Sequence, residues 1–494
     1  MKKLFLTATI LVANAVMLLA QTVDSRLLTM EDVISLAQEK SVLGLTYKNA
    51  YLSSYWSFRS YQAEYRPSLF LSSNLVNFNR SLVELQDYQT GEKAFRANYS
   101  MNNDVTLTIS QNIALTGGTL SLSTSVNRLD QYDPSHRSSY YAQPVYLSYT
   151  QSLWGYNRFK WNKKIEPKNY ELAKREYIEN MEQVAQQAVS YFWNYASVRE
   201  ELDRAEKNFD ESKRLYQAAQ TRFNMGTLTR DNLLQLELSM LNDSLALCNS
   251  RVSLRTALNR LCSFIGYQEN SDILLSIDYK VPDITLNYDE VMTMAIQNSS
   301  FELGQDIQSI QADASIAEAK ANRGMSASIH AQFGMSGTAD TFDETFATLN
   351  DQEIFGVSLV IPIVDWGLGK GRVKMATAQA ERTRSQLQQD LIDFRQNMYT
   401  QVMQFNNQYS QCEISRRAAE IAEESYNIAL SNFSSGSMTV TELNQLKNNR
   451  DNANNTYVNN IGRFWDYYFG IRKATLYDFI NKINITTEFD KLLK

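Results

Sequence analysis

Side chains that could carry catalysis or bind a metal are scarce in this sequence of 494 residues, which holds two histidines and three cysteines. His136 lies in a polar segment and His330 on the polar side of an alternating segment, and neither has a second histidine or a cysteine nearby. A structural zinc site takes about four such ligands, and a nucleophilic cysteine takes a neighbouring base. We therefore expect no metal site, no cofactor and no Cys–His catalytic pair.

The three cysteines are predicted to be free thiols. Cys248 and Cys262 share one predicted helix and lie fourteen residues apart, which is roughly 21 Å along a helix and beyond the reach of a disulfide. Cys412 lies on another predicted helix. A contact between Cys248 and Cys412 stays open at this point.

Two further signals for chemistry are weak. The run Gly367-Leu-Gly-Lys-Gly-Arg372 resembles a phosphate-binding loop but lacks the spacing of one, and a turn from a strand to a helix explains it better. No Ser/His/Asp set and no pair of acid and base carboxylates stands out. With 48 Lys and Arg against 54 Asp and Glu, the chain is mildly acidic without a long basic block, which argues against nucleic-acid binding. The sequence therefore predicts a protein that is not an enzyme.

Residues 1–20 have the pattern of a secretory signal peptide. Lys2 and Lys3 precede an apolar run from Leu4 to Leu19, and Ala20 offers a small residue for cleavage. The run is shorter than the ~20 residues of a spanning helix, so a membrane anchor is the weaker reading. No later stretch is long and apolar enough for a helical span. An exported chain of this kind is periplasmic, secreted or inserted in an outer membrane as a β-barrel.

Two long segments lack helix breakers and predict helical hairpins at about 167–265 and 370–475. Each holds one glycine in its interior, Gly226 or Gly436, which predicts a long helix, a tight turn and a shorter returning helix. A threonine three residues after each glycine can cap the returning helix. The two predicted hairpin tips are Gly226, Thr227, Leu228 and Thr229, and Gly436, Ser437, Met438 and Thr439. Apolar residues in the long arms recur every 3.5 residues, which predicts helices packed side by side in a wide assembly or, as an alternative, an ordinary long bundle.

The chain is duplicated, because Leu28–Ser41 matches Leu286–Ser299 without a gap and the two hairpin turns match as well. This predicts repeats at 21–283 and 284–478, followed by a tail at 479–494. Each repeat holds a short helix, a strand region at about 66–154 or 326–364, and a hairpin.

The strand regions alternate between apolar and polar residues, as in Val105, Leu107 and Ile109 with threonine and serine between them. Aromatic residues gather at their ends, including Tyr140, Tyr141, Trp154, Trp161 and Trp366. This pattern is typical of transmembrane barrel strands, although a soluble sandwich also explains the alternation. One chain supplies four to six strands, too few to close a barrel, so several copies are expected.

The order of these elements resembles the TolC family of outer-membrane efflux channels over about residues 25–478. Local motifs agree, among them Tyr65-Arg-Pro-Ser-Leu, Ile361-Pro-Ile-Val-Asp-Trp-Gly367 and the segment from Gly226 to Glu237. The resemblance implies an α+β membrane protein in which three copies close a twelve-stranded outer-membrane barrel, continued by a long periplasmic α-helical barrel. The strand region 66–154 is longer than two strands require. Residues 78–103 and 128–143 are expected to form extended surface loops, and the segment Thr116-Gly-Gly-Thr119 could add a further hairpin.

The resemblance also implies the function and the partners. A homotrimer in outer-membrane lipid would conduct small molecules or proteins passively, as the exit duct of a tripartite pump or a type I secretion system. Its tips would meet a periplasmic adaptor (membrane fusion) protein, and an inner-membrane RND, ABC or MFS transporter would supply the energy. At the entrance gate, Glu442 matches the first acidic position of the family and Gln445 the second. Because Gln445 is uncharged, this entrance should be less negative than a gate with two acidic rings. Two alternatives are a periplasmic coiled-coil scaffold without a pore and a secreted hydrolase.

Overall fold

The computed structural model describes residues 27–86, 91, 93–133, 135–267 and 273–493. The predicted signal peptide at 1–20 lies outside these residues. The chain divides into two compact units, one of residues 53–172 and 303–390 and one of the remaining segments. None of the helices in the described part of the chain combines the length and the apolar composition that crossing a bilayer takes.

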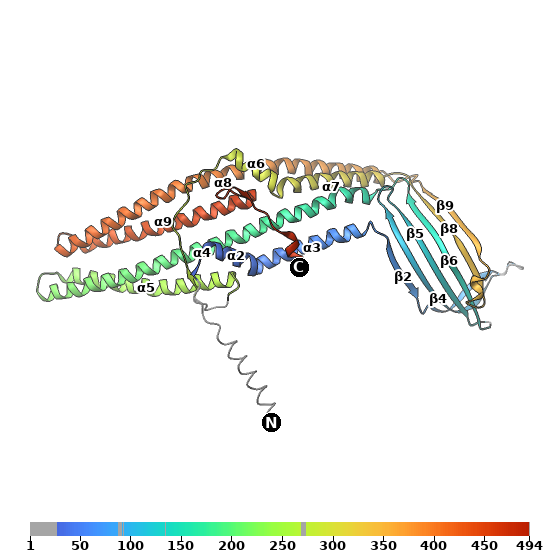
Figure 1. Cartoon of the computed structure of the whole chain (residues 1–494), viewed down its shortest axis with the longest axis horizontal. Helices are drawn as coiled ribbons and strands as arrows, with labels where there is room; N and C mark the ends of the chain where they lie inside the picture. The colour runs from blue at the N-terminus through green and yellow to red at the C-terminus, as the bar shows by residue number, and fades with distance from the viewer. Residues whose placement is uncertain (1–26, 87–90, 92, 134, 268–272, 494) are drawn as a thin grey trace, which may run out of the picture. The chain divides into compact units, whose positions relative to one another are not determined.

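The first unit contains one antiparallel sheet, and Figure 1 shows its strands side by side from β2 to β9. The strand order is β2-β4-β5-β6-β8-β9, and β3 pairs with β4 outside this path. The strands of the sheet are β2 (Ser68–Asn74), β3 (Phe78–Gln86), β4 (Lys93–Ile113), β5 (Gly118–Gln131), β6 (Arg137–Ser152), β8 (Ser326–Ala339) and β9 (Asn350–Val360), with the 3-10 turn η1 (Glu344–Phe346) between the last two.

Alternation along each strand gives the sheet one apolar and one polar face. Residues that pair directly across neighbouring strands point to the same face. One such row across five strands is apolar and runs through Leu69, Ile109, Leu122, Leu147 and Phe333. The next row carries hydroxyl groups, and Thr108 Oγ1 lies 3.0 Å from Ser123 Oγ.

A register shift and a turn in the sheet have local causes. The register between β6 and β8 shifts between Ala142 and Val145, where Pro144 has no N–H to give to a ladder. The turn between β4 and β5 contains Gly117 at φ 81°, a conformation that glycine adopts without strain.

The expectation of surface loops at 78–103 and 128–143 is wrong, because strands occupy most of both segments. β3 pairs with the first half of β4, from Phe78 with Met101 to Gln86 with Lys93. Phe95, Ala97 and Tyr99 do alternate with polar residues, but charged Glu84 and Arg80 interrupt the alternation on the partner strand, which weakens the signal that strand prediction depends on. The additional hairpin around Thr116-Gly-Gly-Thr119 is confirmed, because this segment joins β4 to β5.

Helices form most of the remainder of the described chain. They are α2 (Met30–Lys40), α3 (Val42–Ala63), α4 (Arg158–Asn224), α5 (Arg230–Phe264), α6 (Tyr288–Asn298), α7 (Phe301–Ala321), α8 (Leu368–Ser435), α9 (Val440–Thr475) and α10 (Phe489–Leu492). Two-residue strands add the parallel pair β1 (Leu27–Leu28) with β7 (Leu274–Leu275) and the antiparallel pair β10 (Tyr477–Asp478) with β11 (Ile483–Asn484). The duplication is visible in this order, since α2, α3, α4 and α5 correspond to α6, α7, α8 and α9.

The first hairpin, expected from about residue 167, begins earlier, because α4 starts at Arg158 and Pro167 lies inside it. Asn157 explains the earlier start, because its side chain accepts the N–H of Lys160 at 3.0 Å and so satisfies one of the free donors of the first turn.

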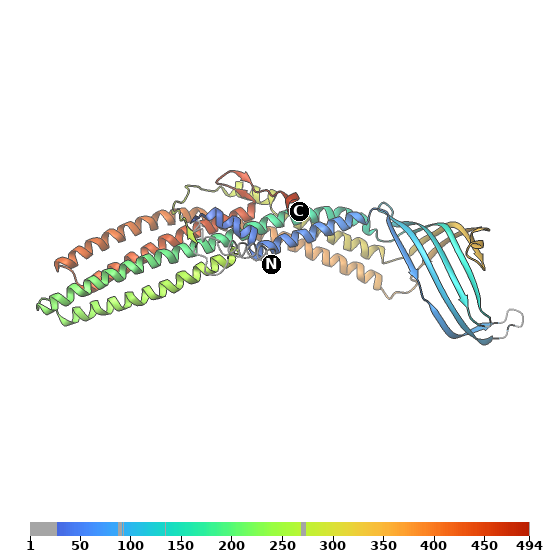
Figure 2. The same ribbon diagram turned by 60° about the horizontal axis from the view of Figure 1, so that its bottom comes forward.

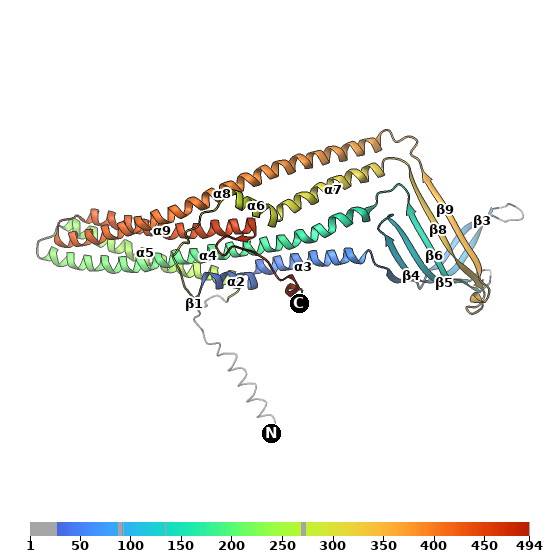
Figure 3. The same ribbon diagram turned by 45° about the horizontal axis from the view of Figure 1, so that its top comes forward.

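Within the second unit, α4–α5 and α8–α9 form two antiparallel hairpins side by side, as Figures 2 and 3 agree. The core between them includes fully buried Phe192, Phe405 and Phe464, and the rings of the last two lie 5.0 Å apart. Burying each such side chain contributes about 1.5–3 kcal/mol. Cys262 and Cys412 are buried and Cys248 is exposed, and all three are free thiols, as predicted.

Candidate functional site at the hairpin tips

The turn between α4 and α5 is built on Gly226, which has φ 75°. The N–H groups of Gly226 and Thr227 bond back to the carbonyls of Phe223 and Arg222, both at 2.9 Å. Thr229 then caps α5 by accepting the N–H of Asn232. The sequence therefore located this turn and its capping residue correctly.

The turn between α8 and α9 follows the same plan around Gly436, with φ 84°. Here the capping residue Thr439 and Glu442 form a reciprocal pair. The Glu442 carboxylate accepts the backbone N–H of Thr439 at 2.9 Å and its hydroxyl at 2.8 Å. These bonds, the backbone bond above all, hold the pKa of Glu442 below its ordinary value. Gln445, one turn later, is exposed and donates to Asn449.

The two tips contact each other within their unit. Arg222 donates from Nη2 to the carbonyl of Ser434 at 2.8 Å. Leu228 packs beneath the tips against a cluster that includes Leu236 of α5 and Val440 of α9, and Met438 packs against a second cluster around Tyr426 and Leu443. Thr227, Thr229, Ser437 and Thr439 are exposed, whereas Leu228 and Met438 are half-buried. Met225, which directly precedes the first tip, is 65% exposed and was not among the residues predicted from the sequence.

Buried charges join the two hairpins near the tips, and no local sequence pattern indicated them. Lys447 of α9 is 9% exposed and donates to both oxygens of Asp243 of α5, at 2.5 and 2.6 Å. Arg450, one turn later, is 5% exposed and bonds to Asn208 of α4 and to Asp451. Such groups are found buried when they are paired.

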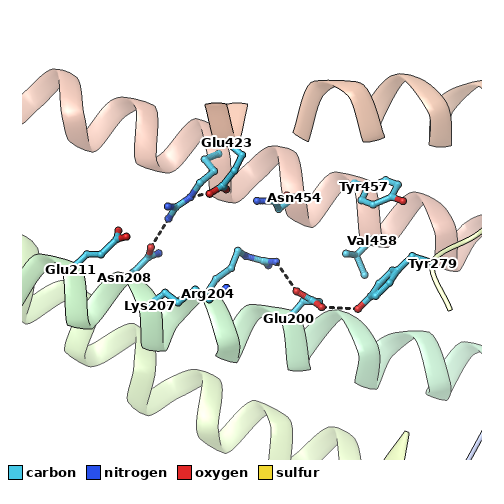
Figure 4. Close-up of a pocket in the computed structure, with 11 residues that line it drawn as sticks. Glu200, Arg204, Lys207, Asn208, Glu211, Tyr279, Glu423, Asn454, Tyr457 and Val458 are labelled. Carbon is cyan, nitrogen blue, oxygen red and sulfur yellow. Dashed lines mark hydrogen bonds and ion pairs between the residues drawn. The ribbon is translucent and has the colours of Figure 1, made fainter. Parts of the chain in front are cut away.

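A polar pocket of about 320 Å³ lies beside Arg450, and Figure 4 shows its lining side chains converging from both hairpins. The guanidinium of Arg450 lies 4.0 Å from the ring centre of Tyr426, and the Tyr426 hydroxyl donates to Glu211 at 2.9 Å. Burial, together with the charge of Glu211, raises the pKa of Tyr426, so this hydroxyl stays a donor. Burial opposes the charge of Arg450, but the neighbouring Asp451 outweighs it and the pKa of Arg450 is raised. These contacts hold one hairpin against the other.

The remaining candidates for chemistry have structural roles. The carboxylate of Asp365 accepts the N–H groups of Gly367 at 2.8 Å and Gly369 at 2.9 Å, so the glycine run begins α8 and its free N–H groups are satisfied from within. His330 lies 3.3 Å from the hydroxyl of Thr150 on the polar face of the sheet. Among the described residues, no group of three His, Cys, Asp or Glu side chains could hold a metal ion.

The family model for outer membrane efflux proteins matches residues 113–267 and 302–464, which is more than half of the chain. The chain belongs to this family. The two matched segments fall one in each repeat. A search of curated proteins finds no match.

Solved structures show the same fold at low sequence identity. The outer membrane channel CmeC of Campylobacter jejuni is 13% identical, with a TM-score of 0.67, over 94% of this chain and 88% of that chain. VceC of Vibrio cholerae is 15% identical, with a TM-score of 0.63, over 90% and 95%. The MtrE channel of Neisseria gonorrhoeae is 12% identical, with a TM-score of 0.61, over 90% and 88%.

The chain is therefore an outer-membrane efflux channel with a periplasmic extension, and it is a transporter component rather than an enzyme. Channels of the TolC family are trimeric. The family assignment rejects both the scaffold without a pore and the secreted hydrolase.

Proposed function

We propose that the chain acts as a homotrimer and forms the exit duct of a tripartite pump or a type I secretion system. Substrates enter at the hairpin tips, cross a water-filled lumen and leave through the membrane barrel. The duct is passive, and an inner-membrane transporter supplies the energy through a periplasmic adaptor. The cargo is small molecules or proteins.

Exposed apolar seams on α5 and α8 carry the proposal of a homotrimer. On α5 the exposed residues alternate in steps of four and three, namely Leu234, Leu238, Leu241, Leu245, Cys248 and Val252. On α8, Ile414, Ile421 and Ile428 recur every seven residues and are 52–70% exposed. A seam of this period fits a neighbouring helix, and long apolar stripes in water mark an interface. The seams on α5 and α8 of one copy would therefore pack against the α5 and α8 seams of the neighbouring copies.

Mass measurement tests this assembly. The purified chain should be a trimer by light scattering in detergent, and Leu238→Asp should shift it to smaller species because a charge enters the seam. Asn242→Asp is the matched control, since it adds the same charge to an exposed position of α5 outside the seam. A monomeric unmodified chain, or equal dissociation of the two variants, would contradict the proposal.

The hairpin tips are proposed to dock the adaptor. Leu228 and Met438 support their own tips from beneath, so aspartate at either position disturbs the turn as well as any docking. Met225 is exposed, so a substitution there tests docking more directly. Met225→Asp should abolish export while trimers persist, and Met225→Gln, which keeps the length without a charge, should retain more of it. Full export by Met225→Asp would argue against tip docking.

Glu442 is proposed to line the entrance, with Gln445 as an uncharged second position. Three Glu442 carboxylates facing one axis would favour cations. Glutamine can serve in the same capping pair as glutamate, so Glu442→Gln removes the charge and keeps the helix cap. In planar bilayers this variant should lower cation selectivity and block by trivalent cations, and Gln445→Glu should raise both. Unchanged values in both variants would place Glu442 away from the entrance.

A further inference from the structure

The sheet of one chain offers more strand positions than a twelve-stranded barrel of three copies would use, which is four per chain. β2 and β3 pair with successive halves of β4, from Ser68 with Ser110 to Asn74 with Asp104 and then from Phe78 with Met101 onward. They therefore occupy one position between them. Together with β4, β5, β6, β8 and β9 they make six positions within the described residues.

The hairpin of β4 and β5 is an integral part of this ladder. The two strands pair from Ser100 with Gln131 to Ile113 with Gly118. Hydrogen bonds hold its turn against the end of β6 and the segment between β6 and α4 of the same chain. Gln151 donates to the carbonyl of Thr116 at 2.8 Å, and Asn157 donates to the carbonyl of Ala114 at 3.1 Å. At the other side, Asn112 donates to the carbonyl of Glu64 at 3.0 Å, at the end of α3.

The same hairpin also shares the two faces of the rest of the sheet. Ile109 and Leu122 are 43% and 44% exposed, similar to Phe333 of β8 at 51%. A hairpin folded across the sheet on its apolar side would bury Ile109 and Leu122, and both stay exposed; on the polar face Thr108 and Ser123 are buried and in contact with each other. On the opposite face a row of hydroxyls crosses from β4 to β6 through Ser110, Ser121 and Ser148. All six positions thus form one layer, apolar on one side and uncharged polar at the centre of the other.

The two outer positions of the ladder, β2 with β3 and β9, are unpaired on their outer sides among the described residues. Both carry apolar residues, including Leu69 and Leu71 on β2 and Val357 and Leu359 on β9, all 53–67% exposed. A strand edge in a bilayer must find hydrogen-bonding partners, because lipid offers none. Strand direction alternates along the six positions, so β9 of one copy and β2 of the next would run antiparallel, as the ladder requires.

We propose that three copies close a barrel of eighteen strand positions, with β9 of one copy paired to β2 of the next. This proposal rests on the proposed homotrimer. Barrel diameter grows roughly in proportion to strand number, and barrels of 16–18 strands enclose an aqueous channel. The membrane exit is therefore about 1.5 times as wide as that of a twelve-stranded barrel, with a wall of neutral hydroxyl groups at mid-height. Selection of cargo then falls to the entrance at the hairpin tips.

Cysteine cross-linking in the full-length trimer tests the edge pairing. With Cys248, Cys262 and Cys412 replaced by alanine, Ser358→Cys on β9 is combined in turn with Ser68→Cys, Phe70→Cys or Ser72→Cys on β2. A second set combines Ser358→Cys with Ser121→Cys, Ser123→Cys or Ser125→Cys on β5. Cross-links in the second set would indicate a sheet of only four positions, β5, β6, β8 and β9, with β2 and β4 outside the barrel.

We expect oxidation to give covalent trimers in the β2 set and none in the β5 set. Covalent trimers in the β5 set, or none in the β2 set although light scattering shows intact trimers, would overturn the barrel of eighteen positions and leave the homotrimer standing. A monomer by light scattering would overturn the homotrimer, and the larger barrel with it.

Discussion

The two repeats of the chain differ most in their strands and least in their helical hairpins. The first repeat contributes four positions to the sheet and the second contributes two, β8 and β9. The hairpin turns, by contrast, match in glycine, in positive φ and in a capping threonine. A hairpin adds two antiparallel strands and keeps the direction of all others, so a sheet tolerates such an insertion. The helical hairpins are constrained along their length by each other.

A second difference lies in how each helical hairpin is charged. α9 of the second repeat supplies buried Lys447 and Arg450, and α4 and α5 of the first supply their partners Asn208 and Asp243. At the tips, the second repeat has the acidic capping partner Glu442 and the first has Asn232 at the same position. The repeats have therefore become complementary rather than equivalent.

Breaking the buried pair should have the largest effect. Lys447→Met leaves Asp243 buried without its cation and should lower the free energy of unfolding by about 3 kcal/mol. The double variant Lys447→Met with Asp243→Leu should recover most of the loss, because it removes both charges. Urea unfolding in detergent, followed by the helical circular dichroism signal, measures the change.

The matched control for this pair is Arg416→Met on α8. Arg416 also contacts two carboxylates, Glu413 and Glu420, but it is 45% exposed, so its loss should be under about 1 kcal/mol. Equal losses for Lys447→Met and Arg416→Met would mean that the buried pair does not hold the hairpins together.

Alanine at the turn glycines should show where the two repeats are still equivalent. Gly226 and Gly436 both have φ between 75° and 84°, and a Cβ at either would meet nothing within 4 Å. The penalty is then backbone strain alone, about 1–2 kcal/mol at each tip. Amide hydrogen exchange at the tips should speed up by about five- to thirtyfold in both variants. Gly371→Ala in α8, where φ is not positive and space is open, should produce no such increase; a large difference between the two tips would contradict their equivalence.

Low pH should affect hydrogen-exchange protection at the two tips differently, and this is the smallest of the expected effects. The folded-state pKa of Glu442 is lowered by its bonds to Thr439, so its contribution is present above its ordinary value of 4.5 and is lost as the pH falls through the folded pKa. Protection of the α9 first-turn amides from hydrogen exchange should therefore decrease in that range, relative to the α5 first turn. Glu442→Gln should remove the pH dependence. The same pH response at both tips would show that the capping pair is not its source.

The sequence predicted what depends on local chemistry. Gly226 and Gly436 with their threonines indicated both turns, and alternation around Val105 and Leu107 indicated the sheet. The strands at 78–103 were missed because charged residues interrupt their apolar alternation, as where Arg80 pairs with Tyr99 and Glu84 with Phe95. Lys447 and Asp243 were missed because they lie 204 residues apart, and each alone resembles a solvated helix charge. Contacts of that separation depend on how the hairpins pack, which no local pattern contains.

Conductance in planar lipid bilayers tests the central claim most directly. The purified full-length chain, shown to be trimeric in the same detergent, is added to one side of the membrane and single insertions are recorded. An outer-membrane exit channel predicts discrete, cation-selective conductance steps without any energy source. Membrane-inserted trimers that conduct no ions, with the unmodified chain and with Glu442→Gln alike, would contradict a passive exit duct.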